Sequence, residues 1–221
     1  MQEENSSSQR DKVTIISVKK KRSAGIEGFV LKLSEGTSFF LISDVYYRNS
    51  VFEGESVSLE KIEALREESE YLLAERKAFD LLSRGMHTRK QLKDKLLKRK
   101  FESVVVDRTL KRMEELGYLD DAEYAKTWVE MRKERHPEGR SAMISGLIKR
   151  GVKHETAENI VKELFSEEDE WEAANKVYDN FLKTNKPNEE KLYRYLTNRG
   201  FSYSIVGKLL ERYRRESYNE F

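Results

Sequence analysis

The sequence predicts a mainly helical protein of three tandem three-helix repeats, preceded by a small N-terminal β subdomain that contains a hairpin. Three observations support this fold class. Short β-like runs are confined to the first part of the chain, helical periodicity dominates from Tyr71 onward, and an internal repeat of about 50 residues relates three segments. Such repeats stack on their neighbours, so we expect an elongated, curved body.

The composition also favours a modular body. Of the 221 residues, 37% are charged and 38% are hydrophobic, which leaves little apolar material for one large core. The 42 basic and 40 acidic residues nearly balance, so any nucleic-acid-binding signal has to come from local clusters. Cysteine is absent, the N-terminus is polar, and no apolar run approaches the roughly 20 residues of a membrane span. We therefore expect a cytoplasmic protein that does not associate with membranes.

The first elements are a tail and a small sheet. Residues 1–10 lack hydrophobic periodicity, which predicts a disordered tail. Residues 11–56 make up the predicted β subdomain, and the connector 34–36 ends in a glycine, as hairpins often require. Two or three strands alone are marginal in water, so this subdomain should pack on the following helices or on a partner. The β-like runs are 13–16, 29–33 and 39–42.

A linking helix at 57–70 is predicted to connect the β subdomain to the repeats. Ser58 is its expected N-cap, because a serine hydroxyl can accept a hydrogen bond from the first turn. The run 67–70 is polar all round, which predicts a break or a solvated bridge before the repeats begin.

The repeats are defined by an alignment without gaps. Its apolar positions recur at helical spacing, which predicts that they form the core of each copy. The aligned positions are Leu92, Leu96 and Arg99 in the first copy, Met143, Leu147 and Arg150 in the second, and Leu192, Leu196 and Arg199 in the third. The predicted boundaries are 71–118, 119–165 and 166–216. Trp128, Trp171, Tyr178 and Phe181 lie at helical core spacing and are interpreted as core residues.

Capping patterns mark the helix starts. Thr88 and Gln91 have the spacing of a capping box, and Asp120 with Glu123 is an acidic version of the same pattern. Each cap is worth about 1 kcal/mol, so these residues explain register before they explain function.

Terminators mark the helix ends. Gly151 and Gly200 suit the left-handed position after a helix, whereas the first copy has Lys100 there. After the last helix of the first copy, the side chains of Tyr118 and Leu119 are expected to pack into the core.

No residue pattern predicts catalysis, a metal site or a cofactor. His87, His136 and His154 are isolated, and we expect them at helix ends. No glycine-rich loop precedes a Lys-Ser or Lys-Thr pair, so no phosphate cradle for a nucleotide is predicted. Adjacent aspartates such as Asp120 and Asp121 can act as acid and base, but at a helix start they are usually caps. We therefore predict a protein that is not an enzyme.

Basic clusters are the strongest functional signal. Lysines and arginines recur at equivalent positions around Arg99, Arg150 and Arg199, so stacked copies would carry positive charge along one side. The alternative for these arginines is structural, namely a cation that binds the last carbonyl groups of each helix. Further clusters are Lys19, Lys20, Lys21 and Arg22, and, near the end of the chain, Arg212, Arg214 and Arg215.

Several segments resemble the RecX family of bacterial regulatory proteins. The resemblance covers about residues 71–215, and the β-rich front portion resembles an extension found in some members. The residues that carry it are Leu81-Leu82-Ser83-Arg84, Thr88-x-x-Gln91-Leu92, Gly117-Tyr118-Leu119-Asp120-Asp121 with Tyr124-Ala125, and Gly139-Arg140 followed by Ile148-Lys149-Arg150-Gly151-Val152.

The resemblance implies a non-catalytic body of three three-helix repeats, and we expect a monomer that needs no cofactor. It also implies that this body binds the RecA recombinase filament on single-stranded DNA, lies in the filament groove and mainly inhibits the recombinase. The setting would be homologous recombination, DNA repair and the SOS response. On this basis we predict a contact surface for the filament or for nucleic acid, composed of Lys93, Lys95, Lys98, Lys100, Arg132, Lys133, Arg135, Arg140, Lys149 and Arg150.

Two alternatives stay open at this point. The chain could be an independent DNA-binding protein whose three-helix units act as helix-turn-helix readers, whereas weak direct DNA binding alone would agree with the filament regulator. It could also be a scaffold without any role on nucleic acid. Salt dependence separates these classes, because direct binding through phosphates weakens in proportion to the number of contacts as salt rises.

Overall fold

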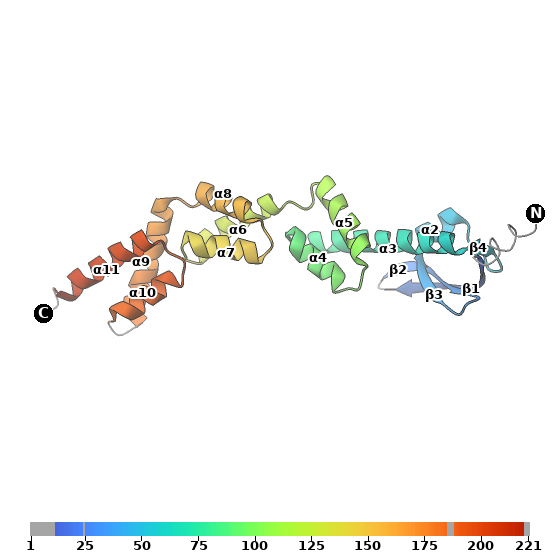
Figure 1. Cartoon of the computed structure of the whole chain (residues 1–221), viewed down its shortest axis with the longest axis horizontal. Helices are drawn as coiled ribbons and strands as arrows, with labels where there is room; N and C mark the ends of the chain where they lie inside the picture. Colours follow the sequence, from blue (N-terminus) through green and yellow to red (C-terminus); the bar gives the residue numbers. More distant parts are fainter. Residues whose placement is uncertain (1–11, 24, 185–187, 219–221) are drawn as a thin grey trace, which may run out of the picture. The chain divides into compact units, whose positions relative to one another are not determined.

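The computed structural model describes residues 12–23, 25–184 and 188–218, and the predicted tail at 1–10 lies outside them. The chain divides into two compact units. Unit 1 comprises Met1–Arg84 and Lys93–Glu115, and unit 2 comprises Gly85–Leu92 and Leu116–Phe221. Within the described residues, strands occur only before residue 59 and helices make up most of the rest, as predicted (Figure 1).

Unit 1 begins with a four-stranded antiparallel sheet in the order β3-β2-β1-β4. The predicted hairpin is confirmed, because Leu33 N–H donates to the carbonyl of Thr37 at 2.9 Å across the turn between β2 and β3. β1 and β2 form a second hairpin that the sequence did not reveal, and the basic residues of the first cluster lie within β1. The strands are β1 (Lys12–Ser23), β2 (Ile26–Leu33), β3 (Ser38–Ile42) and β4 (Ser56–Ser58).

The sheet packs on two helices, α2 (Ser43–Asn49) and α3 (Leu59–Leu82). Phe29 of β2 stacks on Tyr46 of α2 with ring centroids 3.9 Å apart. The core between sheet and helices is fully closed, which agrees with the expectation that so small a sheet needs helical support. Its members include Ile15, Leu31, Leu41, Val45, Ile62 and Leu65.

Helix α3 is continuous, so the predicted break at 67–70 is wrong. The polar residues of this run have tertiary partners. The buried Ser69 hydroxyl accepts from Ile42 N–H at 3.0 Å and donates to the carbonyl of Phe40 at 3.3 Å, and Glu70 accepts from Glu102 N–H at 2.7 Å. Bonds to the edge of β3 and to the backbone of Glu102 therefore hold a stretch whose pattern predicted exposure to solvent. The predicted N-cap is confirmed, because Ser58 accepts from Lys61 N–H.

The next two helices are α4 (Arg89–Leu97) and α5 (Ser103–Glu115). The capping box at the start of α4 is confirmed in both directions. Thr88 N–H donates to Gln91 Oε1 at 3.2 Å, and Gln91 N–H donates to Thr88 Oγ1 at 3.1 Å. Helix α5 packs on α3 and buries Val106, Leu110 and Met113 completely.

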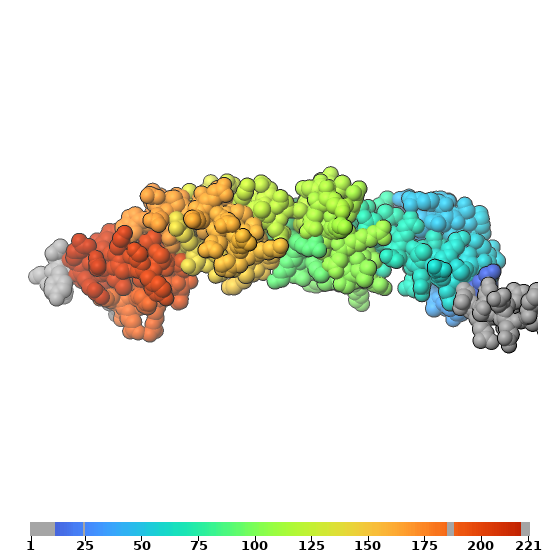
Figure 2. All heavy atoms as spheres, turned by 45° about the horizontal axis from the view of Figure 1, so that its top comes forward, coloured from blue at the N-terminus to red at the C-terminus, as the bar shows by residue number. Residues whose placement is uncertain are grey.

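Unit 2 contains the remaining helices around one core (Figure 1). The helices are α6 (Asp121–Arg135), α7 (Arg140–Lys149), α8 (His154–Leu164), α9 (Glu167–Thr184), α10 (Glu189–Thr197) and α11 (Tyr203–Tyr218). Drawn as spheres, the side chains fill the spaces between the ribbons of each unit (Figure 2). Among the helices of the described residues, none combines the length and apolarity needed to cross a membrane.

The aligned core positions are buried as predicted. Leu92, Leu96, Met143, Leu147, Leu192 and Leu196 are all fully inaccessible to solvent. Trp128, Tyr178 and Phe181 are also buried, as expected.

Two aromatic predictions are wrong. Trp171 is 37% exposed and lies near the Lys208 ammonium group, and Tyr118 is 59% exposed while its neighbour Leu119 is buried. Gly117 has a φ of 73°, in the left-handed region that often follows a helix, and of the two apolar residues after it only Leu119 is buried.

Candidate partner-binding surface

The predicted contact residues lie on short segments of both units. Lys93, Lys95, Lys98 and Lys100 belong to α4 and the turn after it, whereas Arg132, Lys133, Arg135, Arg140, Lys149 and Arg150 lie on α6 and α7 or directly after them. Some of these residues form contacts that hold the scaffold together, and the others have exposed side chains.

Three of the cations form ion pairs between elements. Lys93 binds Asp107 of α5 at 2.8 Å, and Lys133 of α6 binds Asp169 of α9 at 2.8 Å. The hydrogen bond from Lys133 lowers the pKa of Asp169 below its ordinary value. Arg132 forms a bidentate pair with Glu138, with N–O distances of 2.7 and 3.1 Å, and this carboxylate raises the arginine pKa. These contacts orient helices, so we remove all three residues from the candidate surface.

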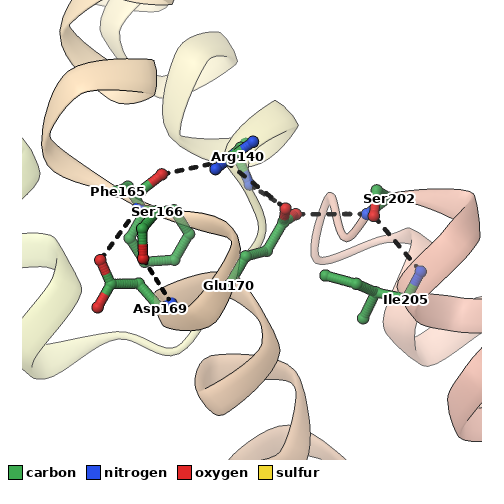
Figure 3. A network of polar contacts seen from close by, with 7 residues as sticks. All are labelled: Arg140, Phe165, Ser166, Asp169, Glu170, Ser202 and Ile205. Carbon is green, nitrogen blue, oxygen red and sulfur yellow. Dashed lines mark hydrogen bonds and ion pairs between the residues drawn. The ribbon is translucent and has the colours of Figure 1, made fainter.

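Arg140 belongs to a polar network around the buried Glu170 (Figure 3). Its guanidinium donates to the carbonyl of Phe165 at 3.1 Å and lies 3.7 Å from the Glu170 carboxylate. The backbone N–H groups of Arg140 and Ser202 both donate to Glu170 Oε1, at 3.2 and 3.4 Å. One carboxylate of α9 therefore caps the starts of α7 and α11, and Arg140 balances its charge.

Two of the repeated arginines have the structural role that we gave as the alternative. Arg99 donates to the carbonyl of Lys95, and Arg150 donates to that of Gly146, both at 2.8 Å. Arg150 also lies over the Trp128 ring at 4.8 Å from its centroid. The third, Arg199, lies over the Tyr195 ring at 4.0 Å. In two of the three copies this arginine therefore binds a carbonyl group near the end of its own helix.

The other predicted residues make up the candidate surface, which has a part on each unit: Lys95, Lys98 and Lys100 on unit 1, and Arg135 and Lys149 on unit 2. All five side chains are exposed. Lys95 lies in the last turn of α4, and Lys98 and Lys100 lie in the turn that follows it. Cationic groups at the end of a helix are favoured by the helix dipole. Their exposed positions suit contact with a polyanion or an acidic protein surface.

Lys100 is also unusual in its backbone. Its φ is 66°, in the left-handed region, like Gly151 with 99° and Gly200 with 75° at the aligned positions. A Cβ atom at Gly151 would clash with Lys90, and one at Gly200 would clash with Ala142, so glycine is needed there for space as well as for conformation. The first copy follows no other copy, and its terminator can therefore carry a long basic side chain.

A series of acids was missed by the sequence reasoning. Glu70, Asp121 and Glu170 occupy the same position of the repeat alignment, and each accepts a backbone N–H at the start of a helix. Asp121 accepts from Arg89 at 2.6 Å, and Glu170 accepts from the aligned Arg140. Glu70 accepts from the backbone N–H of Glu102. Glu170 also accepts from the backbone N–H of Ser202, which is aligned with Glu102. The signal was present, because the alignment places an acid at this position in every copy.

Other polar residues considered for chemistry also sit at helix ends. Asp120 accepts from the N–H groups of Ala122 and Glu123, which confirms it as a cap. His136 follows α6 and His154 begins α8, as expected for isolated histidines.

The family model described as "RecX, first three-helix domain" matches residues 74–113. Curated relatives named "Regulatory protein RecX" match far more of the chain. The protein of Chlorobium phaeobacteroides is 32% identical over 145 residues, which is 93% of its length and 62% of this chain. That of Clostridium perfringens is 24% identical over 216 residues, 99% of its length and 95% of this chain.

Solved structures give the same picture of the fold. One crystal structure of a regulatory protein RecX has a TM-score of 0.67 at 20% identity and covers 90% of this chain and 99% of its own. The RecX structure from Lactobacillus salivarius has a TM-score of 0.56 at 21% identity and covers 65% of this chain and 96% of its own. The family model, the sequence relatives and the fold agree, and the chain belongs to the RecX family of regulatory proteins.

Proposed function

We propose that the chain regulates homologous recombination by binding the RecA filament on single-stranded DNA, within the filament groove, and by mainly inhibiting the recombinase. The observation that carries this proposal is a set of exposed cations, the candidate surface, on a scaffold whose relatives are named regulatory proteins. Several of the other basic residues form ion pairs between elements, whereas the side chains of the candidate surface are exposed.

A nucleoprotein filament suits such a surface for two reasons. Its DNA backbone is a polyanion, and lysines bind phosphates without regard to sequence, which a regulator acting along a whole filament requires. Complementary charge also speeds association and fixes orientation between two proteins. The helices that carry these lysines are held by caps and cross-element ion pairs, so the cations are presented on rigid elements.

The proposal is tested by reversing the charge of the lysines around the end of α4. The triple variant Lys95→Glu, Lys98→Glu and Lys100→Glu should lose inhibition of recombinase ATPase and strand exchange. The matched control is Lys126→Glu, Lys153→Glu and Lys162→Glu, which removes the same charge from exposed positions of unit 2. We expect the control to inhibit like the unchanged protein. If the first triple variant inhibited equally well, this assignment of the contact surface would be wrong.

A further inference from the structure

We propose that the outer face of the N-terminal sheet, with the hollow beside α3, binds single-stranded nucleic acid independently of the helical repeats. Three features favour this ligand: lysines that alternate onto one face of the sheet, an aromatic ring on the same face, and a surplus of positive charge in the hollow. Binding to nucleic acid is measured without recombinase, so its failure can be told apart from failure of the proposed function.

The pairing register assigns the basic residues of β1 to two faces. Residues paired across an antiparallel ladder project to the same side of the sheet, and successive residues alternate. Val18 pairs with the fully buried Leu31 and Lys20 with the buried Phe29, so Lys20 and Arg22 belong to the core side. Lys19 and Lys21 therefore project to the opposite, outer face, about 6.6 Å apart along the strand.

An aromatic ring lies on this outer face. Phe40 pairs with Val30, which in turn pairs with Lys19, so Phe40 and Lys19 share a side of the sheet. A Cβ atom at Gly28 would overlap the Phe40 ring, so glycine is what lets the ring lie over β2. Gly28 is itself paired with Lys21. The register therefore sets a half-buried aromatic ring beside a lysine, an arrangement that suits stacking of an unpaired base next to its phosphate.

A hollow of roughly 630 Å³ continues from this face toward α3. Phe40, Ser23 and Ile26 line it from the sheet, and the basic residues Arg76, Lys77, Arg84 and Arg99 line it together with Asp80. Lys77 and Arg84 share the single carboxylate of Asp80, and hydrogen bonds from both lower its pKa. Arg76 lies 3.7 Å from the carboxylate of Asp44, which does not line the hollow. Positive charge in the hollow thus exceeds negative charge.

The repeat alignment explains why this place is open. In unit 2 the carbonyl of Arg150 accepts from Thr88 Oγ1 at 2.5 Å, and that of Arg199 accepts from Gly139 N–H at 2.8 Å. The start of the preceding copy's middle helix therefore covers the turn after each arginine. No copy precedes Arg99, which lines the hollow with Phe101 instead. The end of the repeat series thus leaves a basic site that another chain can occupy.

Single-stranded nucleic acid fits this site better than duplex or acidic peptide. An extended strand can place phosphates along Lys19 and Lys21 and a base on Phe40, whereas the bases of a duplex are already stacked on one another. An acidic peptide would pair with the cations, but its carboxylates would not stack on the Phe40 ring.

The experiment is fluorescence anisotropy of the full chain with a labelled oligo-dT at several salt concentrations. The double variant Lys19→Ala and Lys21→Ala should weaken binding several-fold and reduce the salt slope by about 1.4, because each lost phosphate contact contributes about 0.7. The matched control, Lys20→Ala and Arg22→Ala, removes the same charge from the same strand on the other face and should retain the original affinity. Phe40→Leu should weaken binding about fivefold or more.

Other results would overturn the proposal. Equal weakening by both double variants would mean that affinity depends only on the total positive charge of β1 and not on its outer face. Unchanged binding by the variant Lys19→Ala and Lys21→Ala would exclude the outer face as the binding site. Tighter binding of a duplex of the same length, or displacement of oligo-dT by a poly-glutamate peptide at equal charge concentration, would also contradict it. Thermal unfolding of each variant checks that the sheet is intact, and the double variants alter only exposed side chains.

Discussion

Residues at equivalent positions of the three copies differ in backbone strain, and Lys100 is the clearest case. It adopts a φ of 66°, which costs an ordinary residue roughly 1–2 kcal/mol relative to the right-handed region. The aligned Gly151 and Gly200 avoid this cost. In exchange, this position carries an exposed basic side chain, which belongs to the candidate surface.

Replacing Lys100 by glycine should therefore stabilise the fold. We expect a gain of about 0.5–1 kcal/mol, because relief of the left-handed strain exceeds the entropy that glycine loses on folding. Urea unfolding followed by circular dichroism measures it. The reciprocal variant Gly151→Lys should be clearly destabilised, since its Cβ would clash with Lys90. A loss of stability in Lys100→Gly would show that the lysine side chain contributes to folding.

A second residue-scale feature is the cluster of Tyr178, Arg212 and Glu216. The fully buried Tyr178 donates its hydroxyl to Glu216 Oε2 at 2.6 Å, and Arg212 donates to Oε1 at 2.7 Å. The tyrosine hydrogen bond first, and then the arginine, lowers the pKa of Glu216. Burial together with the same hydrogen bond raises the pKa of Tyr178. Both shifts favour a neutral tyrosine beside a charged glutamate.

The shift at Glu216 gives stability a pH dependence. A lowered folded-state pKa means that its contribution is complete above the ordinary value of about 4.3 and is lost as pH falls through the folded-state value. The difference in unfolding free energy between the unchanged protein and Glu216→Gln should therefore shrink from pH 6 to pH 3. Urea unfolding at several pH values measures this difference, and Glu211→Gln controls for the loss of a charge on the same helix. A constant difference would exclude the linkage.

At the scale of elements, the starts of helices are held by acids from other helices. The carboxylates of Glu70, Asp121 and Glu170 reach helix starts that lie elsewhere in the chain. Glu170 is 3% exposed and serves two helices at once. An acid at a helix start satisfies free N–H groups and meets the positive end of the helix dipole. The same position thus aligns helices within a copy and between copies.

Glu170→Ala should cost about 2 to 3 kcal/mol, because two backbone N–H groups lose their acceptor and Arg140 loses its counter-charge. Glu168→Ala is the matched control, since this exposed acid lies in the same first turn of α9 and should cost less than about 1 kcal/mol. Chemical denaturation of both variants decides between them. Equal costs would mean that the acid acts only through the dipole of its own helix.

Local patterns predicted the elements better than they predicted contacts between elements. The capping box at Thr88, the cap at Asp120 and the buried leucines follow from spacing alone, and all are confirmed. The break expected at 67–70 is absent because Ser69 and Glu70 find partners on β3 and near α5, distant in the sequence. Periodicity could not show that these polar residues face protein rather than water.

At the scale of the whole molecule, the sequence predicted the fold class and the family, but it did not show which basic residues form ion pairs within the fold. Arg132, Lys133 and Arg140 belong to a basic run in the sequence, yet each is bound to an acid from another position. Charge clusters in the sequence do not reveal which cations are already paired in the fold. The boundaries of the three repeats stay a prediction, as does the assignment of partner contacts to Lys95, Lys98, Lys100, Arg135 and Lys149.

The measurement that tests the central claim most directly is co-sedimentation of the protein with recombinase filaments and with bare single-stranded DNA, each at two salt concentrations. We predict strong binding to filaments and weaker, more salt-sensitive binding to bare DNA, with filament binding lost in the variant Lys95→Glu, Lys98→Glu and Lys100→Glu. Equal binding to bare DNA and filaments, with a log-log salt slope near −0.7 per phosphate contact, would instead indicate an independent DNA-binding protein. Absence of binding to either would contradict a role on the filament.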